Sequence, residues 1–390
     1  MRRELGVLLA GIATIAVTYG FARYAFGLFV PPIAASLELS DTLVGLVGGA
    51  SHLGYAVGLL VAPSWCRRHR AGVIAAGAGV TAAVGLAGVA ASRGVWTLGV
   101  AVALGGMASG LASPALARLV VAIFAPEVRS AAQTWVNSGT SVGLAVSAPT
   151  VLLAASWRAT WAVLAAVSLA TAAVVAATVR GRERTSRAAP PSAARPPRRP
   201  RAIRPRDVRL VGFCTVLGAT SAGYWTFSVQ RVTEAGLAAA WSTWFWVTIG
   251  VVGLAGGRAG AQAARIGLPR TVQRWALLWT ASLATLGLPT VAGPLALASA
   301  AGFGAAFMAL TGLAIVWATE VHDDAATGVR ACFLSLGVGQ AVGTPAAGAI
   351  ADAVGAPAAF LTAAAVSLLL LAPVVRPTDR AVRANHPERV

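Results

Sequence analysis

Long apolar segments alternate with short polar ones along almost the whole chain, and twelve of them are long enough to cross a bilayer. A membrane-spanning helix needs about 17 to 25 apolar residues, or more when it is tilted. Because backbone amides in lipid must be satisfied within the segment, continuous runs of this length predict α-helices rather than barrel strands. The predicted spans are residues 5–34, 43–63, 72–92, 95–124, 131–154, 157–179, 208–230, 237–257, 274–292, 294–319, 330–351 and 356–375.

One polar segment interrupts this alternation near the middle of the chain. Residues 180–207 are rich in arginine and proline, a composition that predicts an extended, solvated linker. Six spans precede this segment and six follow it. The predicted organisation is a six-helix bundle at 1–179, the linker at 180–207, a second six-helix bundle at 208–375 and a cytoplasmic tail at 376–390.

The two halves contain a weak internal repeat. Residues 105–149 align without a gap with residues 301–345, at a constant offset of 196, so that Gly143 meets Gly339. Each aligned segment reads as a helix, a short charged loop and a second helix. Two related halves in parallel orientation are one of the plans on which membrane transporters are built.

Composition and charge place the helices in a membrane and give them a direction. Hydrophobic residues make up 57% of the 390 positions and charged residues 11%, against roughly 25% charged residues in a soluble domain. All 31 basic residues are arginines: 26 fall on one side of the predicted spans, 3 on the other side and 2 within spans. Because cytoplasmic loops are enriched in basic residues, both termini are expected on the cytoplasmic side of the inner (plasma) membrane. These arginines favour anionic lipid headgroups as partners rather than nucleic acid, which would need a folded soluble module.

Several short motifs accompany this topology. The first predicted span contains GFARYAFGLFVPP (20–32), the second SHLGYAVG (51–58) and the fifth QTWVNSGTSVGLAVSAP (133–149). With the six-plus-six topology, these motifs make the chain resemble the major facilitator superfamily over essentially its whole length, and within it a bacterial subgroup. The resemblance implies an all-α membrane protein of two pseudo-symmetric six-helix bundles, in which alternating access carries a small-molecule substrate past a site at mid-membrane.

The loops after spans 2 and 8 depart from the pattern of that family. The family's loop is similar to G-x-L-x-D-R-x-G-R-R, whereas the corresponding stretches here are APSWCRRHR (62–70) and GAQAARIGLPR (260–270). The basic residues are kept, but Cys66 and Ala264 stand in the place of the aspartate. In place of the usual charge lock between helix ends, the arginines are expected to meet helix C-terminal carbonyls.

Arg23 is the first candidate for a substrate site. An arginine deep in a span costs about 2.5–3.5 kcal/mol on insertion scales, so it normally faces the bundle interior or water. No acidic residue lies near Arg23 in the sequence, and aligning the halves at Gly20 and Gly223 puts Thr226 opposite it. We expect Arg23 to bind an anionic group of the substrate, and the alternative is a structural arginine bonded to helix-end carbonyls. The expected flanking contacts are Tyr19, Tyr24 and Tyr224.

Arg118 is the second arginine inside a span. Spans 4 and 5 are antiparallel neighbours, and matching their depths places Arg118 beside Asn137. A polar stripe on span 5 has members at i, i+4, i+7 and i+8, which are Gln133, Asn137, Thr140 and Ser141. We therefore expect Arg118 to reach Asn137 or Gln133, with Asn137 contacting substrate and with Arg118 and Gln133 acting in coupling or gating. A structural clamp near the cytoplasmic end is the alternative.

Three further residues and Tyr224 complete the candidate site. His52 in span 2 is a candidate proton carrier because histidine titrates near neutral pH, or else a hydrogen-bonded packing residue. Gln340 in span 11 is assigned to coupling or gating. Tyr224 and Trp225 in span 7 are expected to stack on a ligand. A separate aromatic group in span 8 is typical of an interfacial belt, or of an entrance for lipophilic compounds; it consists of Trp241, Trp244 and Trp246.

The sequence lacks the signatures of an enzyme. It has no metal-ligand cluster, no glycine loop of the GxxxxGK[ST] kind and no carboxylate in the centre of a span. We therefore expect a proton-coupled secondary transporter without a cofactor, with an organic anion as substrate. Two alternatives stay open: proton-driven efflux of lipophilic or drug-like compounds, and a non-transporting receptor or scaffold. The expected partners are the substrate, a coupling proton and membrane lipids, with the protein as a monomer.

Overall fold

The computed structural model describes residues 2–150, 156–179, 205–322 and 324–372, and every regular element in these ranges is a helix. The first half contains α1 (Arg2–Ile15), η1 (Ala16–Tyr24), η2 (Ala25–Phe29), α2 (Val30–Leu37), α3 (Asp41–Arg68), α4 (Ala71–Ala91), α5 (Val95–Ile123), η3 (Pro126–Val128), α6 (Arg129–Asn137), α7 (Gly139–Ser147) and α9 (Trp157–Val179). The second half contains α10 (Pro205–Glu234), α11 (Ala239–Gly253), η5 (Leu254–Arg258), α12 (Ala259–Ile266), α13 (Leu268–Leu286), α14 (Gly293–Val321), α15 (Ala325–Val354), α16 (Ala356–Ser367) and η6 (Leu368–Leu371).

Eight of the described helices are long and apolar enough to span a membrane, with the segments from α1 to α2 and from α11 to α12 each counted as one. The described parts of the other four predicted spans are also helical, but they are broken, more polar or shorter. The fifth is divided at Ser138 into α6 and α7, and the twelfth is the shorter apolar helix Ala356–Leu371. The all-α membrane fold predicted from the sequence is therefore confirmed.

Some predicted boundaries shift. The ninth span was expected at 274–292, but α13 begins at Leu268 and ends at Leu286, because Pro269 suits a first helical turn. Helix α10 begins at Pro205, inside the predicted linker 180–207. Residues 180–204 of that linker, and residues 373–390 with the predicted tail, lie outside the described part of the chain.

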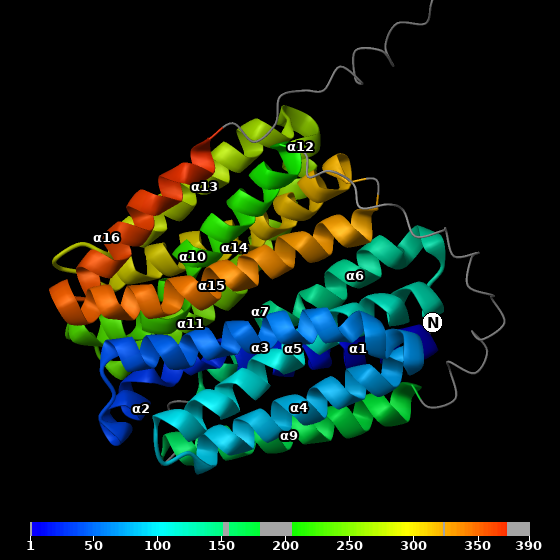
Figure 1. Ribbon diagram of the computed structural model, residues 1–390, viewed down its shortest axis with the longest axis horizontal. Coiled ribbons are helices and arrows are strands. Elements are labelled where there is room, and N and C mark those ends of the chain that lie inside the picture. The colour runs from blue at the N-terminus through cyan, green and yellow to red at the C-terminus, as the bar shows by residue number, and fades with distance from the viewer. Residues whose placement is uncertain (1, 151–155, 180–204, 323, 373–390) are drawn as a thin grey trace, which may run out of the picture.

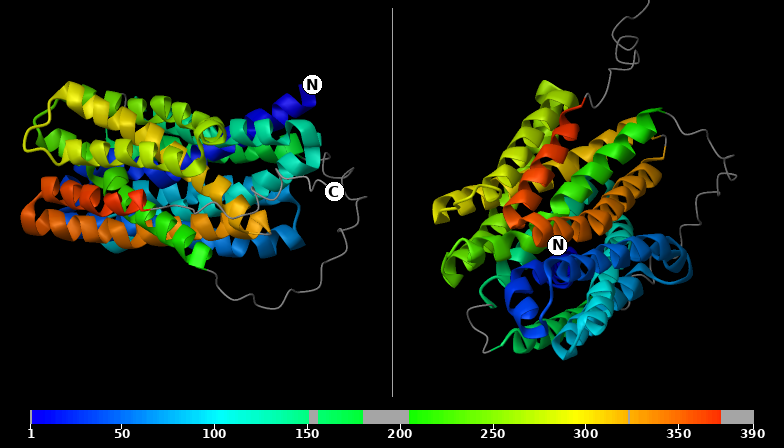
Figure 2. Two further views of the ribbon diagram at one scale, coloured as in Figure 1. Left: turned by 90° about the horizontal axis from the view of Figure 1, so that it is seen from above. Right: turned by 60° about the vertical axis from the view of Figure 1, so that its left-hand side comes forward.

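The two halves form separate bundles that lie side by side (Figure 2). We call the end of the molecule that carries Arg2, the loops 69–70 and 124–128 and the end of α14 the N-terminal face. The opposite end, with the loops 38–40, 92–94, 235–238 and 287–292, is the distal face. The halves lie close together near α2, α3 and α11 at the distal face and diverge toward the N-terminus and α12 (Figure 1).

Glycine allows the two positions aligned in the repeat to pack in the same way. A Cβ atom at Gly143 would overlap the carbonyl of Ala16, and one at Gly339 would overlap the carbonyl of Thr215. Ala16 lies in the first span and Thr215 in the seventh, so each glycine packs on the first span of its own half. Small residues at helix interfaces are the usual means of close packing in membranes.

Candidate functional site

The segment that carries Arg23 is the least regular part of the first span. Element η1 is a π-helix and η2 a 3-10 helix, whereas α1 and α2 on either side are α-helical. Turns of the π type are rare and often occur at functional sites. A Cβ atom at Gly20 would overlap the backbone of Gly143, and one at Gly27 would overlap the carbonyl oxygen of Trp225. The segment is therefore packed tightly against both halves.

Arg23 lies at the end of η1, buried among aromatic rings. Its side chain is 3% exposed. The guanidinium carbon is 3.5 Å from the ring centroid of Tyr55, 5.1 Å from that of Tyr24 and 5.5 Å from that of Tyr19. A cation over a ring face gains about 0.5–2 kcal/mol, the larger values applying where the pair is desolvated. Three of the four tyrosines in the chain thus surround one cation.

The hydrogen bonds of Arg23 lead into the second half of the protein. Its Nη2 donates to Oε1 of Gln340 at 2.6 Å, and Nε2 of Gln340 donates to Oγ of Ser221 at 3.1 Å. Gln340 lies on α15 and Ser221 on α10, and both side chains are fully buried. The site therefore joins the first half to the second. The four side chains around Arg23 are called the arginine cage below: Tyr19, Tyr24, Tyr55 and Gln340.

Four other arginines have a different kind of partner. Each donates to backbone carbonyls at the C-terminal end of a helix, where the helix dipole is negative. Arg23 instead donates to a side-chain amide from the other half, so its observed partner is not the one that the structural alternative expected. The four are Arg118, which bonds to Cys66, Arg129 to Val121 and Phe124, Arg158 to Ala90 and Ser92, and Arg231 to Leu286, Leu288 and Pro289.

Two buried nitrogens near the cage have no hydrogen-bond partner among the described residues. One is Nε of Arg23 and the other is Nδ1 of His52. His52 is 3% exposed and lies three residues before Tyr55 on α3, so the two side chains are on the same side of that helix. The structure thus places His52 near the arginine cage, with one ring nitrogen unused.

Aromatic side chains of the second half continue from the cage. The Trp225 ring stacks on Tyr24, with 4.2 Å between ring centroids and 27° between ring planes. The same indole meets Phe303 and Phe307 edge-on at 5.0 Å and 5.3 Å, and Trp246 at 6.0 Å. A continuous row of rings therefore runs from Arg23 into the core of the second half.

Tyr224 does not flank Arg23 as expected. Its ring stacks on Phe303 at 3.6 Å between centroids, and its hydroxyl shares a hydrogen bond of 2.8 Å with Ser299. Successive side chains on an α-helix point about 100° apart, so Tyr224 and Trp225 face different neighbours. Of the two span 7 residues that were expected to stack on a ligand, Tyr224 and Trp225, only Trp225 contacts the cage.

The tryptophans of α11 do not form a common belt. Trp244 is exposed, whereas Trp246 is fully buried and Trp241 is partly buried. Positions two residues apart on a helix point in different directions, so one stripe cannot present all three to lipid. Only Trp244 keeps the position of an interfacial residue.

Arg118 does not bond to the polar stripe of the fifth span. It donates to the carbonyl of Cys66 near the end of α3, while Nε2 of Gln133 donates to Oδ1 of Asn137 at 3.0 Å. Two polar side chains four residues apart on a helix satisfy each other, and the helix-end carbonyl attracts the cation more strongly. The expected direct hydrogen bond from Arg118 to Asn137 or Gln133 was therefore wrong, and the bond to Cys66 agrees with the alternative of a structural clamp. Arg118 thus bonds to the backbone of Cys66, the residue that stands in the place of the family's aspartate.

Tyr55 and Ser221 belong to the site but were not predicted from the sequence. Tyr55 makes the shortest contact with Arg23, and Ser221 binds the amide that Arg23 binds. The spacing between His52 and Tyr55 was a usable signal, because residues three apart share a helix face. For Ser221 there was no such signal, since serine is common in membrane helices and its depth alone does not select it.

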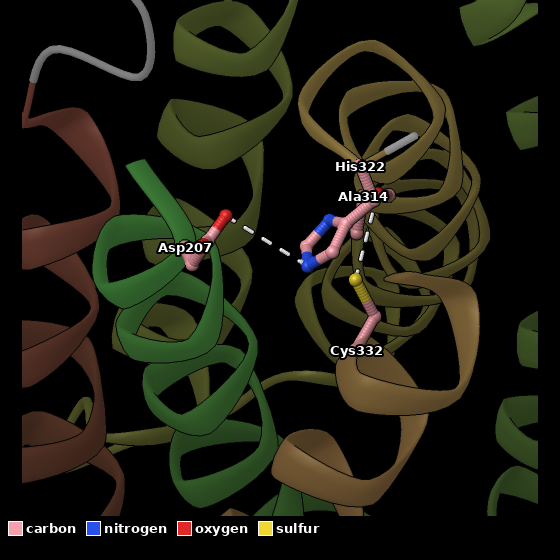
Figure 3. Close-up of polar contacts among 4 residues, drawn as sticks. All are labelled: Asp207, Ala314, His322 and Cys332. Atoms are coloured by element: carbon pink, nitrogen blue, oxygen red, sulfur yellow. Dashed lines mark hydrogen bonds and ion pairs between the residues drawn. The ribbon is translucent and has the colours of Figure 1, made fainter. Parts of the chain in front are cut away.

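A second polar cluster lies at the N-terminal face of the second half (Figure 3). Nε2 of His322, at the end of α14, is 3.8 Å from Oδ1 of Asp207 in the first turn of α10. Nearby, Sγ of Cys332 on α15 donates to the carbonyl of Ala314, at 3.7 Å. These contacts tie α10, α14 and α15 together within one half, so we assign them to the packing of that half.

Hydrogen bonds between the halves close the distal face. Oδ1 and Oδ2 of Asp352, on α15, accept the backbone N–H groups of Asp41 and Thr42 at 2.9 Å and 2.8 Å. Those N–H groups begin α3, where the helix dipole favours a negative charge. Gln230 on α10 donates to the Asp41 carboxylate at 2.7 Å. Beneath these bonds a Cβ atom at Gly45 would lie 2.7 Å from the carbonyl oxygen of Thr344, so α3 and α15 are closely packed.

Removal of the Asp352 carboxylate is expected to open the distal face more often. A lost helix cap costs about 1 kcal/mol, which is roughly a fivefold shift between closed and open states. The measurement is the rate at which a cysteine in place of Thr344, which is fully buried here, reacts with a membrane-impermeant thiol reagent. Asp352→Ala is expected to speed labelling by about fivefold, and Asp352→Asn, with one acceptor left, by less. Equal rates in all three proteins would show that this contact does not hold the face closed.

Comparisons with known proteins agree with this architecture. The sequence profile of the Major Facilitator Superfamily matches residues 12–329. A point mutant of the nucleoside transporter NupG has a similar crystal structure, with a TM-score of 0.72 and 14% identity over 95% of this chain and 98% of that chain. A bacterial homolog of the human lysosomal transporter Spinster, in an inward-facing and unoccupied conformation, gives 0.73 and 14% over 95% of each chain. No curated protein is significantly similar in sequence.

Proposed function

The chain belongs to the major facilitator superfamily of membrane transporters, and we propose that it carries a small organic anion by alternating access, with coupling to protons. The proposed binding site is Arg23 with its cage, where the two halves meet. Binding between two bundles that rock against each other is how this class of fold exposes one site to each side of the membrane in turn.

One observation carries this proposal. Arg23 is a buried cation that contacts residues of both halves, and the side chains that contribute its hydrogen bond and its ring contacts are all neutral. Arg23 donates to Gln340 and lies over three tyrosine rings. A desolvated charge is costly unless an opposite charge or several hydrogen bonds compensate it. A bound anion would supply that charge, and it could also accept a hydrogen bond from Nε of Arg23, which has no partner among the described residues. Because the cation and its amide partner come from different halves, an anion between them would bias the contact between the halves.

Proton coupling is proposed to use His52, which lies beside the cage and whose Nδ1 has no partner in the described part of the chain. Protonation of His52 next to Arg23 would add a second positive charge, which an incoming anion stabilises. Anion and proton would therefore bind together more readily than either alone. His52→Gln is expected to abolish accumulation driven by an imposed pH gradient and to retain exchange of labelled for unlabelled substrate. Loss of both processes would contradict a role in coupling alone.

The direct test is a transport screen with purified protein in proteoliposomes. Labelled organic anions, neutral lipophiles and organic cations are offered under imposed pH gradients of either direction. Accumulation of an anion is the expected result, and Arg93→Ala, which removes an exposed arginine at the distal face, should not change it. Movement of neutral or cationic lipophiles alone would favour the efflux alternative, for which the aromatic row next to Arg23 is the supporting observation. A protein that moves nothing would favour the receptor or scaffold alternative.

We further propose that the N-terminal face is cytoplasmic and the membrane is the cell's inner membrane, as the arginine bias indicates. The three native cysteines are buried, so single introduced cysteines can report topology. In intact cells, an impermeant thiol reagent is expected to label Gly94→Cys, at an open position of the distal face, and not Ser192→Cys in the linker segment. The reverse pattern would invert the assigned orientation.

A further inference from the structure

We propose that the anion carried by this protein is a planar aromatic monocarboxylate with a second hydrogen-bond acceptor. Its carboxylate would bind Arg23, its ring would lie between Tyr24 and Trp225, and its second acceptor would meet an indole N–H. The inference rests on the proposed function and specifies the chemistry of the same site.

The first support is the continuity between the charge and the rings. The Arg23 guanidinium lies 5.1 Å from the Tyr24 centroid, and Tyr24 stacks on Trp225 at 4.2 Å. Tyr24 belongs to the first half and Trp225 to the second. A flat ring placed between them would stack on both halves, replacing one ring contact with two. The ligand would thereby bind to the surfaces that alternating access must separate.

The second support is a set of buried donors that have no acceptor among the described residues. They are Nε of Arg23, Nε1 of Trp225 and Nε1 of Trp246, in side chains 0% to 3% exposed. Guanidinium and indole nitrogens donate but do not accept, so only an acceptor can satisfy them. Buried donors are rarely left unpaired in native proteins. A carboxylate and a further oxygen are the groups that fit these positions.

The position of these donors is what distinguishes them from unpaired donors elsewhere. The indole nitrogens of Trp161 and Trp317 are also unpaired, but those rings pack on Phe29 and Phe213, away from the cage. Trp279, by contrast, does find a partner in Thr220 at 3.2 Å. Of the four buried, unpaired indole nitrogens among the described residues, only those of Trp225 and Trp246 belong to rings in the row that runs from Arg23.

The third support is the charge of the site. Within the part of the chain that the structure describes, Arg23 is the only arginine in contact with these rings, and no lysine occurs in the sequence. While His52 is neutral, the one permanent positive charge balances a monoanion, whereas a phosphate dianion or a dicarboxylate would bring an uncompensated charge into low dielectric. A carboxylate also matches the planar guanidinium in two parallel hydrogen bonds.

The test compares probes of equal charge and different shape by calorimetric titration of the purified full-length protein. The probes are 4-hydroxybenzoate, benzoate, cyclohexanecarboxylate, and the neutral 4-hydroxybenzyl alcohol. We expect 4-hydroxybenzoate to bind at least about fivefold more tightly than cyclohexanecarboxylate, because one stacked aromatic contact contributes a difference of that size. The alcohol is expected to bind more weakly than either carboxylate. Benzoate is expected between 4-hydroxybenzoate and cyclohexanecarboxylate.

Two variants separate the ring from the indole donor. Trp225→Leu is expected to remove the preference for aromatic over alicyclic carboxylates while leaving carboxylate binding. Trp225→Phe keeps a ring, so it is expected to keep that preference and to lose the advantage of 4-hydroxybenzoate over benzoate. A melting curve for each variant confirms that it is folded, and Trp225→Phe decides the matter if Trp225→Leu does not fold.

Failure of this inference differs from failure of the proposed function. If aromatic and alicyclic carboxylates bind equally to the unchanged protein, or if both Trp225 variants keep the full pattern of preferences, the aromatic assignment is wrong while anion binding stands. If no carboxylate binds more tightly than the neutral alcohol, or if Arg23→Ala binds carboxylates as well as the unchanged protein does, the anion function itself is wrong.

Discussion

Transport by the Arg23→Ala variant is expected to fall by about 30-fold or more, while the protein still folds. Truncating one partner of a buried charged pair costs about 2–5 kcal/mol, which corresponds to roughly 30- to 4000-fold. The folded state loses one side-chain hydrogen bond to Gln340 and the ring contacts, and it also loses the cost of a buried cation. The measurement is the initial rate of substrate uptake into proteoliposomes, normalised to folded protein.

Arg23→Lys separates charge from geometry in the same assay. Lysine keeps the positive charge but offers no planar pair of donors, so a partial rate between those of Arg23→Ala and the unchanged protein is expected. Arg231→Ala serves as the contrasting variant, because Arg231 is as deeply buried but bonds to helix-end carbonyls. Arg231→Ala should lower the melting temperature, with transport per folded molecule retained. An Arg23→Ala protein that behaved like Arg231→Ala would assign Arg23 a structural role.

Gly27→Ala is expected to disfavour closure of the distal face. A Cβ atom at Gly27 would overlap the carbonyl oxygen of Trp225, which belongs to the other half. Backbone atoms cannot yield as a flexible side chain can, and overpacking typically costs about 1–3 kcal/mol. The cost applies only while the halves are together at this place, so the population should shift toward the open distal face by about 5- to 150-fold.

The readouts are transport, which should be largely lost, and labelling of a cysteine in place of Thr344, which should become fast. Gly99→Ala is the matched control, because a Cβ atom there meets nothing within 4 Å. Gly20→Ala is a second control, since its clash with Gly143 lies within the first half and should lower stability without opening the distal face. Normal transport by Gly27→Ala would contradict the distal closure described for this conformation.

Much of the candidate site was recognisable because burial of charge in a membrane is costly. Arg23 is conspicuous in a run without carboxylates, and Tyr19 and Tyr24 lie within one turn of it. Gln340, assigned to coupling or gating, proved to be the hydrogen-bond partner of Arg23. The assignment of Arg118 to the fifth span failed because depth matching fixes the height of a side chain and not its direction around the helix. A long arginine side chain at one height can reach several neighbours, and Arg118 bonds to a helix-end carbonyl.

The sequence by itself determined the class of protein, because the bilayer imposes lengths, apolarity and internal hydrogen bonding on any chain that crosses it. The spans, the division into two halves and the isolated cation can all be recognised from the constraints that the bilayer imposes. Only the tertiary structure decided what surrounds the cation. The contacts of Arg23 with Tyr55 and Gln340 join residues from α3 and α15, and they depend on the rotation of each helix and on a π-helical segment that no periodicity announces. Close packing between small residues sets those rotations. This packing involves residues from both halves, so no local stretch of sequence reveals it.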